Sequence, residues 1–118
     1  MTGDVRAVFD RVAFDRQTGG DRALAIEILR MFLEDCPSHV AAIRVAVERG
    51  DALGIRTAAH TLKGSAGYLT ATFVVDAAAR LEIIGQEERL AEAAAALEEL
   101  DGAVAQVIPE LERAALTP

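Results

Sequence analysis

This sequence is short of the residue types that several common protein classes require. Its single cysteine, Cys36, cannot form an internal disulfide or supply a cysteine-based zinc site, so we expect a reducing compartment. No uncharged apolar run reaches the roughly 18 residues that span a bilayer, and the N-terminus lacks the basic and apolar stretches of a signal peptide. We therefore expect a cytoplasmic protein.

Basic residues are also scarce. The chain has 12 lysines and arginines against 19 aspartates and glutamates, which gives a net charge of −7. A nucleic-acid binder needs clustered basic residues to displace counterions from phosphates, and an anionic membrane surface attracts basic segments. The charge balance therefore argues against nucleic acid and against a membrane as partners.

Aromatic residues (4%) and alternating apolar and polar runs, which are typical of strands, are rare, whereas alanine is abundant. The 118 residues fit a single domain, 1–118, and glycines and prolines divide it into helical stretches with short connections. We predict an all-α fold. It should be an antiparallel four-helix bundle with a short extra N-terminal helix near 5–15 and a core of about 14–114.

Capping and breaking residues predict where the longer helices begin and end. Asp21 should begin the second helix, which meets a kink or a restart at Pro37. Its apolar stripe is predicted to contain Leu24, Ile28, Met31 and Phe32 and, after Pro37, Val40, Ile43 and Val47. Asp51 should begin a third helix that runs to about position 69, and Thr70 a fourth that ends before Gly85. Gly102 and Pro109 are weak points of the last helix.

His60 lies in the third predicted helix, opposite its apolar stripe. The residues within roughly 60° of the far side of a helical wheel are Ile55, Ala58, Leu62, Ala66 and Leu69. The residues that share the solvent face with His60 are Arg56, Thr57, Lys63, Gly64 and Gly67. Glycine inside a helix costs about 0.5–1 kcal/mol relative to alanine. We infer that these two glycines let the backbone of another protein approach the imidazole.

This arrangement suits a phosphoryl group carried on histidine. An exposed histidine is mostly neutral at pH 7, and its unprotonated ring nitrogen can act as a nucleophile. A phosphoryl group on that nitrogen brings roughly two negative charges, which Lys63, one turn along the helix, can partly offset. Phosphoryl transfer depends mainly on positioning and charge stabilisation, so few other groups are required at such a site.

The segment His60-Thr61-Leu62-Lys63-Gly64-Ser65-Ala66 resembles the signature of histidine-containing phosphotransfer (HPt) domains of bacterial two-component phosphorelays. Three further stretches agree with it: 32–37, Gly50-Asp51 and Leu81-Glu82. The resemblance covers roughly 14–111. It implies an antiparallel four-helix bundle with an exposed histidine near the middle of one helix.

The resemblance also implies roles for single residues. His60 would accept a phosphoryl group through Nε2 from the aspartyl phosphate of one receiver domain and pass it to another. Lys63 would stabilise its charge, and Gly64 would let the receiver domain dock. The remaining expected docking contacts are Arg56, Thr57, Gly67 and Tyr68. The chain would be a carrier and not an enzyme, without a metal or another cofactor, because any Mg²⁺ would lie on the receiver domain.

Two positions depart from the pattern. Many members carry glycine where this chain has Thr70, so we expect a changed turn in which Thr70 caps the next helix. Tyr68 stands where many members have a small polar residue, and we expect it to alter which partners fit. On the neighbouring helix, Ile26, Leu29 and Leu33 either extend the docking surface or pack against the N-terminal helix.

Two alternatives remain open at this point. A histidine kinase domain could phosphorylate His60 directly, as in chemotaxis kinases, or a hybrid histidine kinase could be a partner. A purely structural interaction module is the other alternative, because apolar residues recur every seven positions at Leu90, Leu97, Val104 and Leu111. Asp101 interrupts that seam, and packing inside one bundle explains the same pattern, so we expect a monomer.

Overall fold

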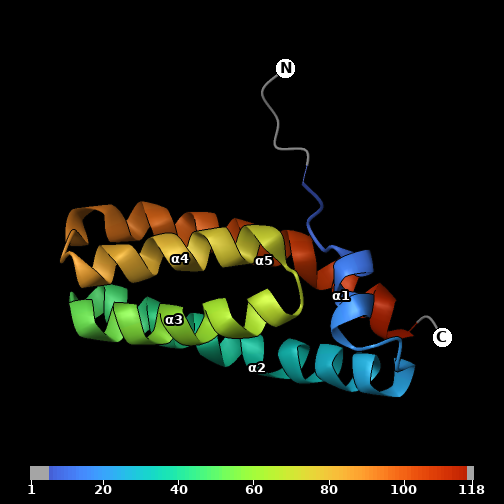
Figure 1. Ribbon diagram of the computed structural model, residues 1–118. Coiled ribbons are helices and arrows are strands. Elements are labelled where there is room, and N and C mark those ends of the chain that lie inside the picture. Colours follow the sequence, from blue (N-terminus) through green and yellow to red (C-terminus); the bar gives the residue numbers. More distant parts are fainter. Residues whose placement is uncertain (1–5, 117–118) are drawn as a thin grey trace.

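The computed structural model describes residues 6–116, and within this range the chain forms helices without any strand. The four long helices are α2 (Arg22–Arg49), α3 (Ala52–Tyr68), α4 (Thr72–Gln86) and α5 (Ala93–Leu116). They lie antiparallel in two layers, α4 with α5 and α3 with α2, and a short α1 (Arg11–Gln17) lies at one end (Figure 1). The predicted all-α antiparallel four-helix bundle with a short N-terminal helix is confirmed. No helix of residues 6–116 is long and apolar enough to cross a membrane.

Aspartate side chains begin three of these helices. Asp10, Asp21 and Asp51 each accept a hydrogen bond from the backbone N–H three residues further on, at 3.0, 3.1 and 2.9 Å. Gly50 ends α2 in the left-handed conformation, with a φ of 62° that glycine adopts without strain. The predicted starts at Asp21 and Asp51 are confirmed.

The first helix begins later than predicted. Position 5 lies outside the described residues, and α1 starts at Arg11 because the side chain of Asp10 caps it there. Phe14 anchors α1 in the core, where it is fully buried with its ring centroid 5.6 Å from that of Phe9. The short helix thereby covers one end of the bundle core.

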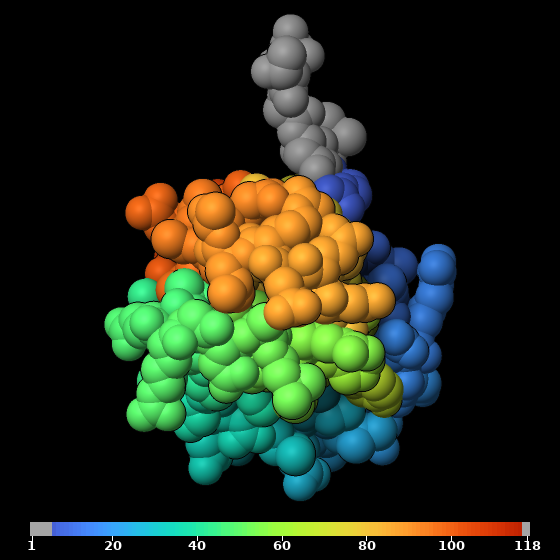
Figure 2. All heavy atoms as spheres, turned by 90° about the vertical axis from the view of Figure 1, so that its left-hand side faces the viewer, coloured from blue at the N-terminus to red at the C-terminus, as the bar shows by residue number. Residues whose placement is uncertain are grey.

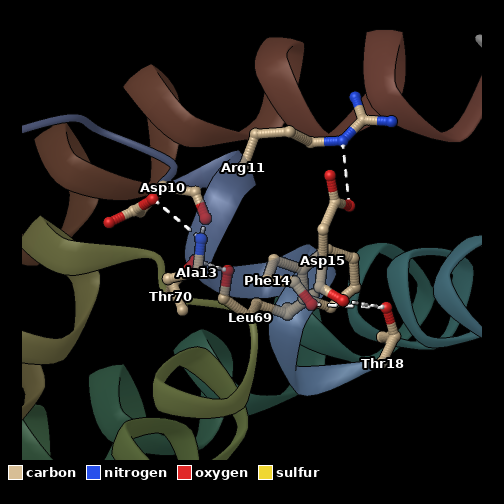
Figure 3. Close-up of polar contacts among 8 residues, drawn as sticks. All are labelled: Asp10, Arg11, Ala13, Phe14, Asp15, Thr18, Leu69 and Thr70. Atoms are coloured by element: carbon tan, nitrogen blue, oxygen red, sulfur yellow. Dashed lines mark hydrogen bonds and ion pairs between the residues drawn. The ribbon is translucent and has the colours of Figure 1, made fainter. Parts of the chain in front are cut away.

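The prediction that Thr70 caps the fourth helix is wrong. α4 begins at Thr72, and Thr70 lies in the left-handed region with a φ of 58°. The Thr70 hydroxyl donates to the carbonyl of Asp10 at 2.7 Å, and the Asp10 N–H donates to the carbonyl of Thr70 at 3.2 Å (Figure 3). A β-branched residue is strained in this conformation, which glycine adopts freely. The two hydrogen bonds to Asp10 oppose that strain and tie the turn to the start of α1.

The buried face of α2 also differs from the predicted stripe. Leu29, Phe32 and Cys36 are buried, whereas Leu24 and Met31 are 41% and 56% exposed. α2 carries apolar side chains on more than one face, because it packs against α1 as well as against the rest of the bundle. Of the predicted stripe, Phe32 and Ile43 are therefore buried and Ile28, Val40 and Val47 are partly buried, whereas the prediction is wrong at Leu24 and Met31.

Pro37 does not restart α2, which is one helix from end to end. Proline removes one backbone hydrogen bond and crowds the preceding turn. Cys36 and Ile43, on either side of it, are 1% and 0% exposed. Burial on both sides of the proline holds the two halves of α2 in line with the core.

The other predicted breaks also lie inside helices. α4 continues past Gly85 to Gln86, and Gly85 is buried. Gly102 and Pro109 both lie within an uninterrupted α5. Two residues of the seven-residue series, Leu97 and Leu111, are buried within the bundle.

The end of the bundle opposite α1 is closed by two connections. The turn between α2 and α3 lies beside the segment that joins α4 to α5, which includes the 3₁₀ turn η1 (Leu90–Glu92) (Figure 2). A Cβ on Gly50 would be 3.9 Å from the Leu90 side chain. Further along, Arg44 of α2 and Asp101 of α5 form an ion pair at 2.8 Å. Asp101, the charge that interrupts the seven-residue series, thus has its partner on another helix of the same bundle.

Candidate functional site

His60 lies on the outer face of α3, where its side chain is 68% exposed. The opposite face is held in the core by the residues that are at most 1% exposed: Ile55, Ala59, Leu62, Ala66 and Leu69. The predicted stripe is confirmed except at Ala58, which is only partly buried while its neighbour Ala59 is fully buried. The solvent-facing orientation predicted for His60 is confirmed.

Glu82 of α4 connects His60 with Lys63. One carboxylate oxygen, Oε2, lies 2.7 Å from His60 Nδ1, and the other, Oε1, lies 2.5 Å from Lys63 Nζ. A carboxylate can only accept hydrogen bonds, so Nδ1 must carry the hydrogen that it shares with Glu82. In the neutral imidazole the lone pair is then on Nε2. In the neutral ring this contact therefore leaves Nε2 without a hydrogen.

The electrostatics of this cluster favour an ionised Glu82. The hydrogen bond from Lys63, and then that from His60, lower the pKa of Glu82, and the smaller effect of its burial opposes them. The Glu82 side chain is 18% exposed, compared with 35% for that of Lys63. A carboxylate at the edge of the site thus remains charged at neutral pH and holds both partners.

Gly64 and Gly67 leave open space beside His60. A Cβ built on either glycine would have no atom within 4 Å, apart from the backbone of its own helix. No contact within residues 6–116 therefore explains why these two helical positions lack a side chain. The open space agrees with the inference that another protein approaches the imidazole here.

The other predicted docking residues lie in different surroundings. Arg56, one turn before His60, is exposed and makes no ion pair with any residue of 6–116. Thr57 is exposed as well, and its carbonyl accepts from the hydroxyl of Thr61 at 3.1 Å. Tyr68 is 42% exposed and lies on the α2 side of α3, where its hydroxyl donates to the carbonyl of Gln17 at 3.4 Å. Arg56 and Thr57 thus share the face of His60, whereas Tyr68 borders it.

A mainly apolar groove runs between α2 and α3 on that side. It is lined by Ile28, Met31, Phe32, Asp35, His39, Ser65, Tyr68 and Leu69. The two alternatives given for Ile26, Leu29 and Leu33 are resolved for Leu29, which is buried beside Phe14 of α1. Ile26 lies at that same junction. The apolar side chains of α2 that are exposed next to α3 are therefore other ones, chiefly Met31.

Glu82 is the residue of this site to which sequence reasoning assigned no role. It formed part of the resemblance as Leu81-Glu82, and it is a single charge among the apolar residues Leu81, Ile83 and Ile84. Its partner lies 22 residues away, on another helix, so periodicity within one helix could not identify it.

Comparison with known proteins agrees with the fold. The model of the Hpt domain family matches residues 27–112. Histidine-containing phosphotransfer protein B (HptB) from Pseudomonas aeruginosa PAO1 is similar, with 20% identity, 92% of this chain and 94% of that chain covered, and a TM-score of 0.86. The HPT domain of the Hpt sensor hybrid histidine kinase from Shewanella has 19% identity, 90% and 92% coverage, and a TM-score of 0.79. No curated protein sequence matches significantly. The family match covers most of the residues, and the chain belongs to the Hpt domain family.

Proposed function

We propose that this chain is a phosphorelay carrier in which Nε2 of His60 takes a phosphoryl group from the aspartyl phosphate of one receiver domain and gives it to the aspartate of another. The observation that carries this proposal is the 2.7 Å contact between Glu82 Oε2 and Nδ1 of an exposed histidine. That contact keeps the hydrogen on Nδ1, so Nε2 has a lone pair in the direction from which a partner can approach.

The transfer step balances without another reactant. The Nε2 lone pair attacks phosphorus, an N–P bond forms, and the bond from phosphorus to the aspartate oxygen breaks with its electron pair on the departing carboxylate. The ring then has a proton on Nδ1, which Glu82 accepts as a hydrogen bond, and a phosphoryl group on Nε2. In the second transfer a receiver carboxylate attacks phosphorus and the N–P electron pair returns to the ring. The chain offers positioning and charge, and we propose that Mg²⁺ lies on the receiver domain.

Lys63 and Arg56 supply the positive charge in this proposal. In the free protein the Lys63 ammonium is held by Glu82 at 2.5 Å. A phosphoryl group on Nε2 would carry roughly two negative charges and would compete with Glu82 for that ammonium. Arg56, which has no ion-pair partner among the described residues, is available to the same group or to acidic residues of the receiver domain.

We propose that receiver domains dock over the open face at Gly64 and Gly67 and on the apolar groove between α2 and α3. Met31 (56% exposed) and Tyr68 (42% exposed) are large apolar side chains at that groove. Buried apolar and aromatic anchors usually contribute most of the affinity of such an interface. Because these side chains lie outside the cluster of His60, Lys63 and Glu82, they suit the choice between partners rather than the chemistry.

Transfer from a panel of phosphorylated receiver domains tests this function. The wild-type chain should gain a label that is lost in acid and kept in base, and His60→Gln should gain none while keeping its helical circular dichroism. The chain has one other histidine, His39, which lines the apolar groove, so His39→Gln is the matched control and should still be labelled at saturating receiver concentration. A label on His60→Gln would place the phosphoryl group elsewhere. A label that appears only with a kinase domain and ATP would favour direct phosphorylation by a kinase.

A further inference from the structure

Gly85 is the point at which α3 and α4 come into backbone contact. A Cβ on Gly85 would lie 2.6 Å from the carbonyl oxygen of Ala52 and from the backbone nitrogen of Arg56, and 3.0 Å from Arg56 Cα. Backbone atoms cannot rotate away as a side chain can, so any residue larger than glycine would push the two helices apart here. Glycine inside a helix costs about 1 kcal/mol relative to alanine, and this contact gives a reason for that cost.

This contact is one helical turn from the functional cluster on both helices. On α4, Gly85 follows Glu82 by three residues, and on α3, Arg56 precedes His60 by four. The helices are antiparallel, so the pair Gly85–Arg56 and the pair Glu82–His60 are successive contacts along the same seam. The separation of the backbones at Gly85 therefore sets how far Glu82 must reach to His60.

The hydrogen bond between His60 and Glu82 crosses this seam. The contact of Glu82 with His60 Nδ1 is 2.7 Å long. A methyl group needs about 3.5 Å from a neighbouring heavy atom, so alanine at position 85 would move the backbones apart by roughly 0.5–1 Å. Added to the present contact, such a shift reaches the distance at which a hydrogen bond is no longer formed.

We propose that Gly85 is a positioning residue for phosphoryl transfer, acting through Glu82: the close contact of α3 and α4 that it permits holds the hydrogen of His60 on Nδ1 and leaves Nε2 free to react. This inference rests on the proposed function, because it assigns Gly85 a part in making His60 the nucleophile. This role distinguishes Gly85 from Gly64 and Gly67, where an added Cβ would have no other atom of the described residues within 4 Å apart from the backbone of its own helix.

The test is Gly85→Ala, studied by the nitrogen NMR signals of the His60 ring and by the rate of transfer from one phosphorylated receiver domain. The wild type should show the hydrogen on Nδ1. The variant should show a mixture shifted towards hydrogen on Nε2, with transfer slowed about tenfold or more, since small misplacements at a reacting centre have effects of this size. Gly102→Ala is the matched control, because its Cβ would enter open space on α5. It should change neither the ring signals nor the rate.

A double-mutant comparison separates this role from a general loss of packing. Glu82→Ala removes the acceptor, so adding Gly85→Ala to it should slow transfer no further. An equal slowing by Gly85→Ala in both backgrounds, or wild-type ring signals in Gly85→Ala, would overturn the proposal. If Gly85→Ala does not fold, Glu82→Asp shortens the reach by one methylene and leaves the helix contact alone. It should cause the same change in the ring signals, and wild-type signals in that variant would also overturn the proposal. Loss of label in His60→Gln, measured in the same assay, tests the proposed function separately.

Discussion

The two sides of α3 differ in chemistry and in how closely they are packed. On the α4 side, backbone contact at Gly85 accompanies a polar cluster in which Glu82 holds His60 and Lys63. On the α2 side lies an open, mainly apolar groove with the exposed side chain of Met31. The difference suggests a division of work. In the proposed function, the reactivity of His60 depends on α4, and the recognition of a partner depends on α2.

The largest effect that tests this division should come from a substitution in the apolar groove on the α2 side of α3. Met31→Glu places a charge in the apolar groove beside α3, and we expect it to weaken docking about tenfold or more, as for an interface anchor worth about 1.4 kcal/mol or more. Because the polar cluster is untouched, the transfer rate at saturating receiver concentration should stay close to that of the wild type. Measuring transfer against receiver concentration separates the two quantities.

The difference between the two sides of α3 predicts that the effect of Met31→Glu on docking depends on the receiver domain. Different receiver domains should lose different amounts of affinity with Met31→Glu, whereas His60→Gln should abolish transfer from all of them. Leu116→Glu, which adds the same charge at an exposed position at the far end of α5, is a suitable control. A fall in the saturated rate without a change in the half-saturating concentration would contradict the division of work.

A smaller effect is expected at the end of α3, where the turn is strained. Thr70→Ala keeps a side chain at positive φ but removes the hydrogen bond to the Asp10 carbonyl, so it should lower the free energy of unfolding by about 1 kcal/mol. Thr70→Gly loses the same bond but relieves the strain, so its stability should lie closer to that of the wild type. Urea unfolding of both variants measures this. Greater destabilisation by glycine than by alanine would mean that the turn is not strained.

Local patterns were enough to predict the orientation of His60. α3 has a single buried stripe, and its cap at Asp51 lies next to a glycine that ends α2, so periodicity and capping agree. The same reasoning was only partly right for α2, where Phe32 and Ile43 are buried as predicted but Met31 is exposed. It also failed at Thr70, because threonine is a common cap residue and is disfavoured at positive φ, so local preference favoured the cap. The hydrogen bonds to Asp10 that favour the turn join residues 60 positions apart.

The contact between His60 and Glu82 could not be predicted for a related reason. It depends on how closely two helices pack, and that distance is set by one glycine on α4 against the backbone of α3. In the sequence, Gly85 lies between the apolar pair Ile83-Ile84 and the polar segment 86–89, which is also typical of the end of a helix. Only the three-dimensional arrangement distinguishes a glycine that ends a helix from one that brings two helices together.

The smallest effect should be a decrease in the free energy of unfolding at acid pH that depends on Glu82, on the α4 side of α3. Hydrogen bonds from Lys63 and His60 lower the pKa of Glu82 in the folded chain. A carboxylate with a lowered pKa stabilises the fold above the pKa of the unfolded chain, and this contribution is lost as the pH falls through the folded pKa. The free energy of unfolding of the wild type should therefore exceed that of Glu82→Gln at pH 7. The difference should be below about 1 kcal/mol, because the cluster lies at the surface.

That difference should shrink as the pH falls from about 5 to below 4, the range in which an unfolded glutamate and then Glu82 take up protons. Urea unfolding of both chains at several pH values measures it. Glu34→Gln removes the same charge from an exposed glutamate that has no ion pair within residues 6–116, and it serves as the control for net charge. A difference that stays constant across this range would mean that Glu82 contributes through packing alone. The α4 side would then differ from the α2 side in shape but not in electrostatics.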